Sequence, residues 1–333
     1  MNPLALIRPN IAQLIPYSSA REEYTGTTGI FLDANEFPEG KYNRYPDPEA
    51  KAVQSVLAAQ IGCAANQLIL GNGSDEIIDW VQRAFGIPGT DNIIICPPTY
   101  GMYEVYANIN NLECIRIPLT GDFQLDIPQI LAQKAKILYL CSPNNPTGNE
   151  LENIEILLQN FQGIVFLDEA YIDFSPSNSK IELLQNYPNL IIAQTLSKAK
   201  GLAGLRLGIG IAHPEIIAVL KKIKPPYNIS QANQELTLQA LQNWDATTIE
   251  TLVKERDKLV EGLKNNPLVR RIFPSVTNFI LVEMTEADRI YAFLTGRNLI
   301  VRNRSKDVPN TLRITVGTPQ DNELLLKTLA EFQ

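Results

Sequence analysis

One stretch of the sequence decides the fold, Leu190-Ile-Ile-Ala-Gln-Thr-Leu-Ser197-Lys198, and Arg206 follows it eight residues after the lysine. Its apolar start is too short for a helix and predicts a buried strand. In open α/β sheets, ligands bind outside the carboxyl ends of the strands, so Ser197 and Lys198 lie where a ligand is expected. A lysine there suits a Schiff base, and the arginine suits a phosphate. A lone lysine is more often a solvated charge, and Lys200 is a second candidate.

Similar apolar runs occur throughout residues 65–212, separated by segments of helical length. They are Leu68-Ile-Leu, Ile93-Ile-Ile-Cys, Ile137-Leu-Tyr-Leu, Ile164-Val-Phe-Leu and Leu207-Gly-Ile-Gly-Ile-Ala. This alternation predicts an α/β fold with a mostly parallel central sheet covered by helices. We expect it to form a large domain over residues 35–240.

The remaining sequence predicts a smaller α+β domain made of residues 1–34 and 241–333. Its expected elements are a helix over residues 245–265, strands over 278–283, 299–302 and 312–316, and helices over 288–297 and from Pro319 onward. We expect the first 30 or so residues to pack on this domain.

Composition excludes several classes of function. The formal charge is −7, with a pI near 5.0, and basic residues do not cluster with aromatic ones, so nucleic acid is not an expected partner. No run is long enough for a signal peptide or a membrane span, which predicts a cytoplasmic protein. Four cysteines without a C-x-x-C pair read as reduced core thiols. A single histidine excludes a His-based triad or a multi-His metal site, and we expect no metal.

Two of the other strand ends carry residues that suit a ligand. After the first run, Gly71-Asn-Gly-Ser74-Asp75 opens a helical pattern, where free backbone N–H groups bind anions. The alternative is a glycine turn in which Ser74 or Asp75 caps the helix. After the second run, Tyr100 could lie flat over an aromatic ligand, although a core or surface tyrosine is equally consistent with the sequence.

Two further strand ends carry an amide and a carboxylate. The rigid loop Ser142-Pro-Asn-Asn-Pro-Thr-Gly148 presents Asn145. Asp168 ends a buried strand, where an unpaired charge is unfavourable, so it needs a cation. A metal of a nucleotide hydrolase would need a G-x-x-x-x-G-K-[ST] loop, which is missing from the sequence. The protonated ring nitrogen of a pyridine cofactor is the other candidate.

Together these residues resemble the class I/II aminotransferases of fold type I, over nearly the whole chain. The motifs are Tyr100, Asn145-Pro-Thr-Gly, Asp168-Glu-Ala-Tyr171, Ser197-Lys198 and Arg206. The branch that the chain resembles most closely is that of the histidinol-phosphate aminotransferases, through Pro16-Tyr17-Ser-Ser-Ala-Arg, Asp33-Ala-Asn-Glu-Phe-Pro, Asn43-Arg-Tyr45-Pro, Cys96-Pro-Pro-Thr-Tyr-Gly-Met-Tyr, Leu202-Ala-Gly-Leu-Arg and Leu312-Arg313-Ile-Thr-Val-Gly. Lys200-Gly201 departs from the pattern, where an aromatic-containing pair is expected.

The resemblance implies a pyridoxal 5′-phosphate enzyme and a role for each residue. Three residues would have catalytic roles. Lys198 would form the Schiff base, and Asp168 would pair with the ring nitrogen. Tyr171, together with Asn145, would form hydrogen bonds with the ring hydroxyl. Tyr100 would stack on the ring. The phosphate would be bound by Ser74, Asp75, Ser197, Arg206 and, from the other subunit of a homodimer, Tyr45. The substrate would be held by Arg302 and Arg313, with Tyr17 and Asn145, and Arg304 competes with Arg302.

The implied reaction exchanges an amino group between histidinol phosphate and 2-oxoglutarate, the oxo acid of glutamate. A threonine-phosphate decarboxylase-like lyase would keep every cofactor residue, and an aromatic amino acid aminotransferase is a further alternative. A non-catalytic binding protein on this fold would be expected to lack Lys198 or Asp168, which are both present.

Overall fold

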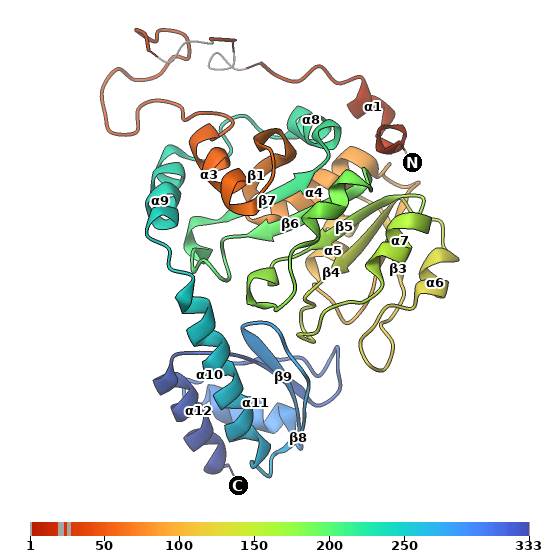
Figure 1. The fold of residues 1–333 in the computed structure, drawn as a ribbon, viewed down its shortest axis with the longest axis vertical. Helices are drawn as coiled ribbons and strands as arrows, with labels where there is room; N and C mark the ends of the chain where they lie inside the picture. The colour runs from red at the N-terminus through yellow and green to blue at the C-terminus, as the bar shows by residue number, and fades with distance from the viewer. Residues whose placement is uncertain (1, 19–22, 25–27, 333) are drawn as a thin grey trace.

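A computed structural model describes residues 2–18, 23–24 and 28–332. The chain forms a large domain around a seven-stranded sheet and a smaller domain around a four-stranded sheet, joined by a long helix (Figure 1). No helix in these residues is long and apolar enough to cross a membrane.

The large sheet has the order β1-β7-β6-β5-β4-β2-β3. β7 runs antiparallel to its neighbours β1 and β6, and the other pairs are parallel, so the prediction of a mostly parallel sheet is confirmed. Its strands are β1 (Leu68–Asn72), β2 (Asn92–Ile95), β3 (Glu113–Arg116), β4 (Ile137–Cys141), β5 (Ile164–Asp168), β6 (Leu190–Thr195) and β7 (Leu207–Ala212).

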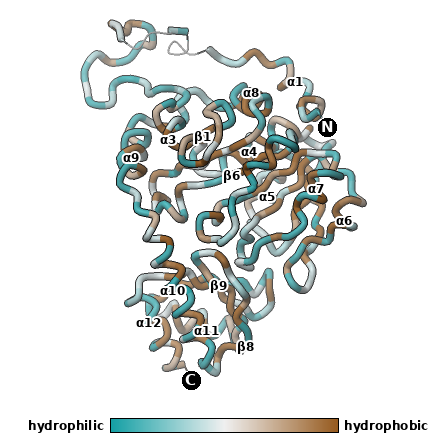
Figure 2. The backbone as a smooth tube through the Cα atoms, viewed as in Figure 1, coloured by the Kyte–Doolittle hydropathy of each residue, from teal (hydrophilic) through white to brown (hydrophobic). Residues whose placement is uncertain are grey.

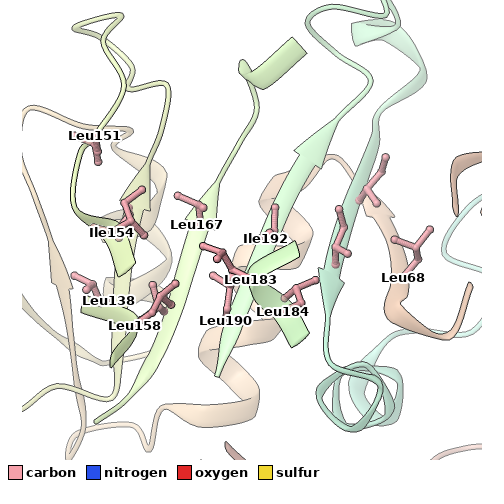
Figure 3. Packing of buried hydrophobic residues seen from close by; sticks show 14 of the residues in the cluster. Leu68, Leu138, Leu151, Ile154, Leu158, Leu167, Leu183, Leu184, Leu190 and Ile192 are labelled. Atoms are coloured by element: carbon pink, nitrogen blue, oxygen red, sulfur yellow. The ribbon is translucent and has the colours of Figure 1, made fainter. Parts of the chain in front are cut away.

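Helices cover both faces of this sheet, which explains why its strands are apolar throughout. Leu138 and Leu140 of β4 point into one core, and Ile137 and Tyr139 of the same strand point into the other. Figure 3 shows the first core across neighbouring strands, and Figure 2 shows the hydrophobic central strands. The helices of this domain are α3 (Lys51–Ile61), α4 (Ser74–Phe85), α5 (Met102–Ile109), α6 (Ile127–Leu131), α7 (Ile154–Asn160), α8 (Pro214–Ile223) and α9 (Gln231–Gln242), with 3-10 turns η2 (Ala65–Gln67), η3 (Ile172–Phe174), η4 (Lys180–Gln185) and η5 (Ala203–Leu205).

The first turns of the chain, residues 3–12, pack on the large domain, which corrects the expectation that they join the small one. η1 (Pro3–Leu6) and α1 (Pro9–Ala12) lie beside α8. Ile11 is buried in the core that α4 and α8 line, and Lys222 on α8 donates to the carbonyl of Ala12. The apolar side of this short segment is therefore buried against the large domain, far from the small one. Beyond it, the described residues up to 46 run along the outside of the molecule (Figure 1).

The small domain contains an antiparallel sheet of order β10-β11-β9-β8, on which helices pack. Its elements are α10 (Thr247–Lys264), β8 (Val269–Ile272), β9 (Phe279–Met284), α11 (Ala287–Thr295), β10 (Arg302–Asn303), β11 (Thr311–Thr315) and α12 (Pro319–Ala330). The α+β prediction is confirmed, although the strand expected over 299–302 shrinks to two residues. Arg302 of β10 pairs directly with Arg313 of β11.

Candidate active site

A cavity of about 530 Å³ lies at the carboxyl ends of the central strands, between the two domains. It gathers most of the residues that the sequence singled out, namely Ser74, Asp75, Tyr100, Asn145, Asp168, Tyr171, Ser197, Lys198, Arg206, Arg302 and Arg313. Arg304 and Thr195 line it as well. The described residues contain no group of three or more side chains that could hold a metal ion.

One end of the cavity is shaped to receive an anion. Helix α4 begins at Ser74, and its N-cap, Gly73, has a φ of 79° and no side chain to bond the free N–H groups. The capping role that Ser74 or Asp75 could have played is therefore not observed. A Cβ on Gly73 would lie 2.7 Å from Nη2 of Arg206, so glycine lets the guanidinium approach the helix start. Free N–H groups and an adjacent guanidinium are a common phosphate-binding arrangement.

At the other end, Asp168 is a buried carboxylate, only 3% exposed. Burial raises its pKa to about 6, while hydrogen bonds from the Tyr103 hydroxyl and the Ala170 N–H act in the opposite direction. Tyr103 donates to Oδ2 at 2.7 Å and Ala170 to Oδ1 at 3.0 Å. In the part of the chain that the structure describes, Asp168 forms no ion pair within 4.0 Å. The site therefore favours a cationic ligand group beside it.

Lys198 is the lysine of the cavity. Its pKa is lowered, first by burial and then by the nearby positive charge of Arg313. Its Nζ lies 5.5 Å from the centre of the Tyr171 ring. Lys200 lies outside the cavity, with its Nζ 3.3 Å from the centre of the Trp244 ring and 3.8 Å from Asp173. The structure thus separates the two candidate lysines.

Three arginines from the small domain meet at the mouth of the cavity. Arg313 donates to Oδ1 of Asn145, which links the two domains, and its buried Nε has no hydrogen-bond partner in the described part of the protein. Arg304, the competitor of Arg302, also faces the cavity; its Nε lies 3.0 Å from Asp307 but, like that of Arg313, forms no hydrogen bond among the described residues. An unsatisfied guanidinium donor beside two further arginines is suited to an anionic substrate.

Two of the predicted residues do not line this cavity. Tyr17 and Tyr45 lie on the exposed N-terminal segment, and Tyr45 stacks on Tyr227 with ring centres 4.5 Å apart. Within a single chain they contact neither Lys198 nor Asp168.

Among the residues that sequence reasoning missed, Tyr103 makes the most direct contact with the acid of the site. It lies in the motif Cys96-Pro-Pro-Thr-Tyr-Gly-Met-Tyr, three residues after Tyr100. Because Tyr100 precedes α5, which begins at Met102, no helical spacing links the two rings, and in the sequence Tyr103 is indistinguishable from an ordinary core tyrosine. Its hydroxyl donates to Asp168, as described above.

Comparisons with known proteins agree with this geometry. The profile of the family described as aminotransferase class I and II matches residues 31–329. A histidinol-phosphate aminotransferase of Parabacteroides distasonis is 47% identical over 339 residues, covering 98% of both chains. The chain belongs to the class I and II aminotransferases, which depend on pyridoxal phosphate.

Two solved structures share the fold. Histidinol-phosphate aminotransferase from Sinorhizobium meliloti, in complex with pyridoxal-5′-phosphate, has a TM-score of 0.79 at 24% identity, covering 86% of this chain and 82% of that one. L-threonine-O-3-phosphate decarboxylase from Porphyromonas gingivalis has a TM-score of 0.74 at 22% identity, covering 87% and 90%. Because an aminotransferase and a decarboxylase share it, the fold alone does not define the reaction.

The residues present fit this cofactor. Among the described residues, a buried acid without an ion-pair partner could pair with a protonated ring nitrogen, and the start of α4 with Arg206 could bind a phosphate. A lysine with a lowered pKa opens into the same cavity.

The raised pKa of Asp168 leads to a prediction about stability. Relative to its ordinary value of 3.8, a pKa of about 6 means that ionisation of this carboxyl opposes folding. Between pH 4 and 6 the unfolded chain releases the proton while the folded chain keeps it, so stability falls as the pH rises. Above about pH 6 the penalty is constant, at about 3 kcal/mol. We expect Asp168→Asn to make the cofactor-free protein more stable than the parent at pH 8 in urea denaturation, by about 1–3 kcal/mol.

The difference between variant and parent should shrink as the pH approaches 4. Asp257→Asn, at an exposed carboxylate, is the control and should show no such trend. A cofactor-free Asp168→Asn protein that is less stable than the parent at pH 8 would contradict the penalty.

Proposed function

We propose that this protein exchanges an amino group between histidinol phosphate and 2-oxoglutarate, with pyridoxal phosphate bound at Lys198. The observation that carries the proposal is the single cavity in which Lys198 and Asp168 face three arginines. The names of the relatives point to the same substrate, since the P. distasonis protein is a histidinol-phosphate aminotransferase at 47% identity.

The position of each side chain in the cavity supports a cofactor-binding role. Lys198 would hold the cofactor covalently, and Asp168 would pair with its ring nitrogen. Ser197, Arg206 and the N–H groups of Ser74 and Asp75 would bind its phosphate. Tyr100 would lie against the ring, an orientation supported by the bond from its hydroxyl to Oδ1 of Asp75 at 2.9 Å. Asn145 and Tyr171 would bond the ring hydroxyl.

When bound, the cofactor supplies an electron sink for charge that develops at the substrate Cα. Once the amino group of the substrate had displaced Lys198 from the cofactor, the freed Nζ would take the proton from that carbon as a general base, which requires the neutral amine. Burial and the charge of Arg313 favour this form, because both lower the pKa of Lys198. Asp168 keeps its negative charge beside the ring nitrogen with the help of two hydrogen bonds.

The arginines would bind the anionic groups of the two substrates. Arg302 and Arg313 are paired on neighbouring strands, so their side chains can approach one doubly charged phosphate. Each charge-assisted hydrogen bond contributes about 1.5–3 kcal/mol. Tyr17 would assist from the N-terminal segment, and Arg304 remains an alternative to Arg302.

We expect the purified protein to transfer amino groups from histidinol phosphate to 2-oxoglutarate, and Arg302→Ala to lower kcat/KM for histidinol phosphate about tenfold or more. Cofactor content should not change, because Arg302 lies on the substrate side of the cavity. Coupled detection of glutamate measures the rate. Arg270→Ala, at an exposed arginine of β8, is the control.

Three results would refute the substrate assignment. They are a preference for phenylalanine, release of carbon dioxide from threonine phosphate, and an Arg302→Ala enzyme that handles histidinol phosphate as the parent does. The first two results would not affect the assignment of the cofactor site.

The active unit we propose is a homodimer in which each site needs both chains. Ile15, Ile30 and Leu32 on the N-terminal segment are 88%, 92% and 89% exposed in the single chain. Several almost fully exposed apolar side chains on one segment are characteristic of an interface. A second copy would cover them and bring its Tyr45 to the cofactor phosphate.

Mixing two inactive or weakened chains tests this sharing. In a heterodimer of Lys198→Ala and Tyr45→Phe chains, one site contains both native residues, so activity should rise above that of the two parents at limiting cofactor. Phenylalanine preserves the stack on Tyr227 and removes only the hydroxyl. Activity equal to the sum of the separate variants would show that the sites are not shared.

We also place the enzyme in the cytoplasm, without a nucleic acid or membrane partner. Its four cysteines are free thiols, two of them buried, which suits a reducing compartment. Its net charge of −7 repels polyanions.

A further inference from the structure

In the part of the chain that the structure describes, Tyr103 is the fully buried side chain whose hydroxyl donates to Asp168, the acid of the site. It lies on the first turn of α5, has no solvent exposure, and donates to Oδ2 of Asp168 at 2.7 Å. The Ala170 N–H bonds the other oxygen, Oδ1. Both oxygens are therefore held, and rotation of the carboxylate would break two hydrogen bonds.

The ring of Tyr103 is fixed on two sides. It stacks on Tyr139 of β4, with ring centres 4.8 Å apart and planes 15° apart, and its other neighbour, Tyr100, meets it edge-on at 5.5 Å. Gln82 of α4 donates to its backbone carbonyl at 3.0 Å. Aromatic contacts and a buried hydrogen bond restrict the ring, so the hydroxyl has little freedom to leave Asp168.

A buried phenol needs an acceptor, but that need does not explain the choice of a carboxylate. Tyr139, in the same stack, uses the backbone carbonyl of Ile78, at 3.4 Å. Donation to an ionised carboxylate is about twice as strong as donation to a neutral acceptor, and it stabilises the charge of the acceptor. The bond from Tyr103 therefore does more than satisfy its own hydroxyl.

We propose that Tyr103 is a positioning residue that holds Asp168 ionised and oriented toward the ring nitrogen of the cofactor. This inference rests on the proposed pairing of Asp168 with that nitrogen. Without the Tyr103 hydroxyl, the buried carboxylate keeps only the bond to Ala170, and the neutral acid becomes favoured. A neutral acid makes a weaker contact with the ring nitrogen than a charged one does.

The experiment compares two cofactors on three proteins. Cofactor-free parent, Tyr103→Phe and Tyr139→Phe are titrated with pyridoxal phosphate and with the analogue in which a carbon atom replaces the ring nitrogen. Tyr139→Phe is the matched control, because it removes a hydroxyl from the same aromatic stack without touching Asp168. Melting temperatures of the cofactor-free proteins report any loss of folding.

For Tyr103→Phe we expect the Kd for pyridoxal phosphate to rise about tenfold, and the Kd for the analogue to stay within about twofold of the parent. In the loaded enzyme kcat should fall while KM changes little. Tyr139→Phe should bind both compounds as the parent does.

Equal weakening toward both compounds would show a merely structural role and overturn the inference, as would an unchanged Kd for pyridoxal phosphate. A parent that binds no pyridoxal phosphate would overturn the proposed function and, with it, the role of Tyr103. A parent that binds it while Tyr103→Phe behaves identically would overturn the positioning role alone.

Discussion

The desolvation of Asp168 is the constraint on which the rest of the site depends. A carboxylate at the end of a buried strand gives up its hydration, and protein groups must replace it. Here only two hydrogen bonds do so, and the pKa stays raised to about 6. The negative charge of Asp168 is therefore incompletely stabilised as long as no cation lies beside it. That imbalance favours a ligand that brings a cationic group to Asp168, as the protonated ring nitrogen of the proposed cofactor would.

The two domains are joined at the same place. The Val276 N–H donates to the carbonyl of Gly148, and a Cβ on Gly148 would lie 2.5 Å from the hydroxyl of Ser275, so this contact requires glycine with its φ of 85°. Three residues earlier in the same loop, Asn145 accepts from Arg313. The loop after β4 thus holds the Asn145 amide and docks the domain that carries the arginines. In the proposed function, cofactor binding and substrate binding would therefore share one rigid support.

Much of this arrangement was predictable from the sequence because the central strands are buried on both faces. Runs such as Ile164-Val-Phe-Leu have no amphipathic alternative, and the polar residue after each run marks the edge where ligands bind. β3 escaped prediction because Glu113–Arg116, at the sheet edge, places charged residues at both ends of a short strand. β10 is short because Ile300 faces solvent and only two residues pair with β11.

Other features depend on tertiary contacts that local patterns do not encode. The short N-terminal helix could have packed on either domain, and tertiary contacts such as Ile11 against α8 and Lys222 with the carbonyl of Ala12 decide between them. Tyr103 looks like an ordinary core tyrosine in the sequence, because its significance lies in one acceptor 65 residues away. In the sequence, both Lys198 and Lys200 were candidates for the cofactor lysine. In the structure, Lys198 lines the cavity, whereas Lys200 lies outside it with its Nζ over the ring of Trp244.

The most direct test of the proposed site is the position of cofactor attachment. Borohydride reduction of the loaded protein, followed by peptide mass analysis, should find the pyridoxyl group on Lys198 in the parent and in Lys200→Ala, whereas a pyridoxyl group on Lys200, or on no lysine, would contradict it.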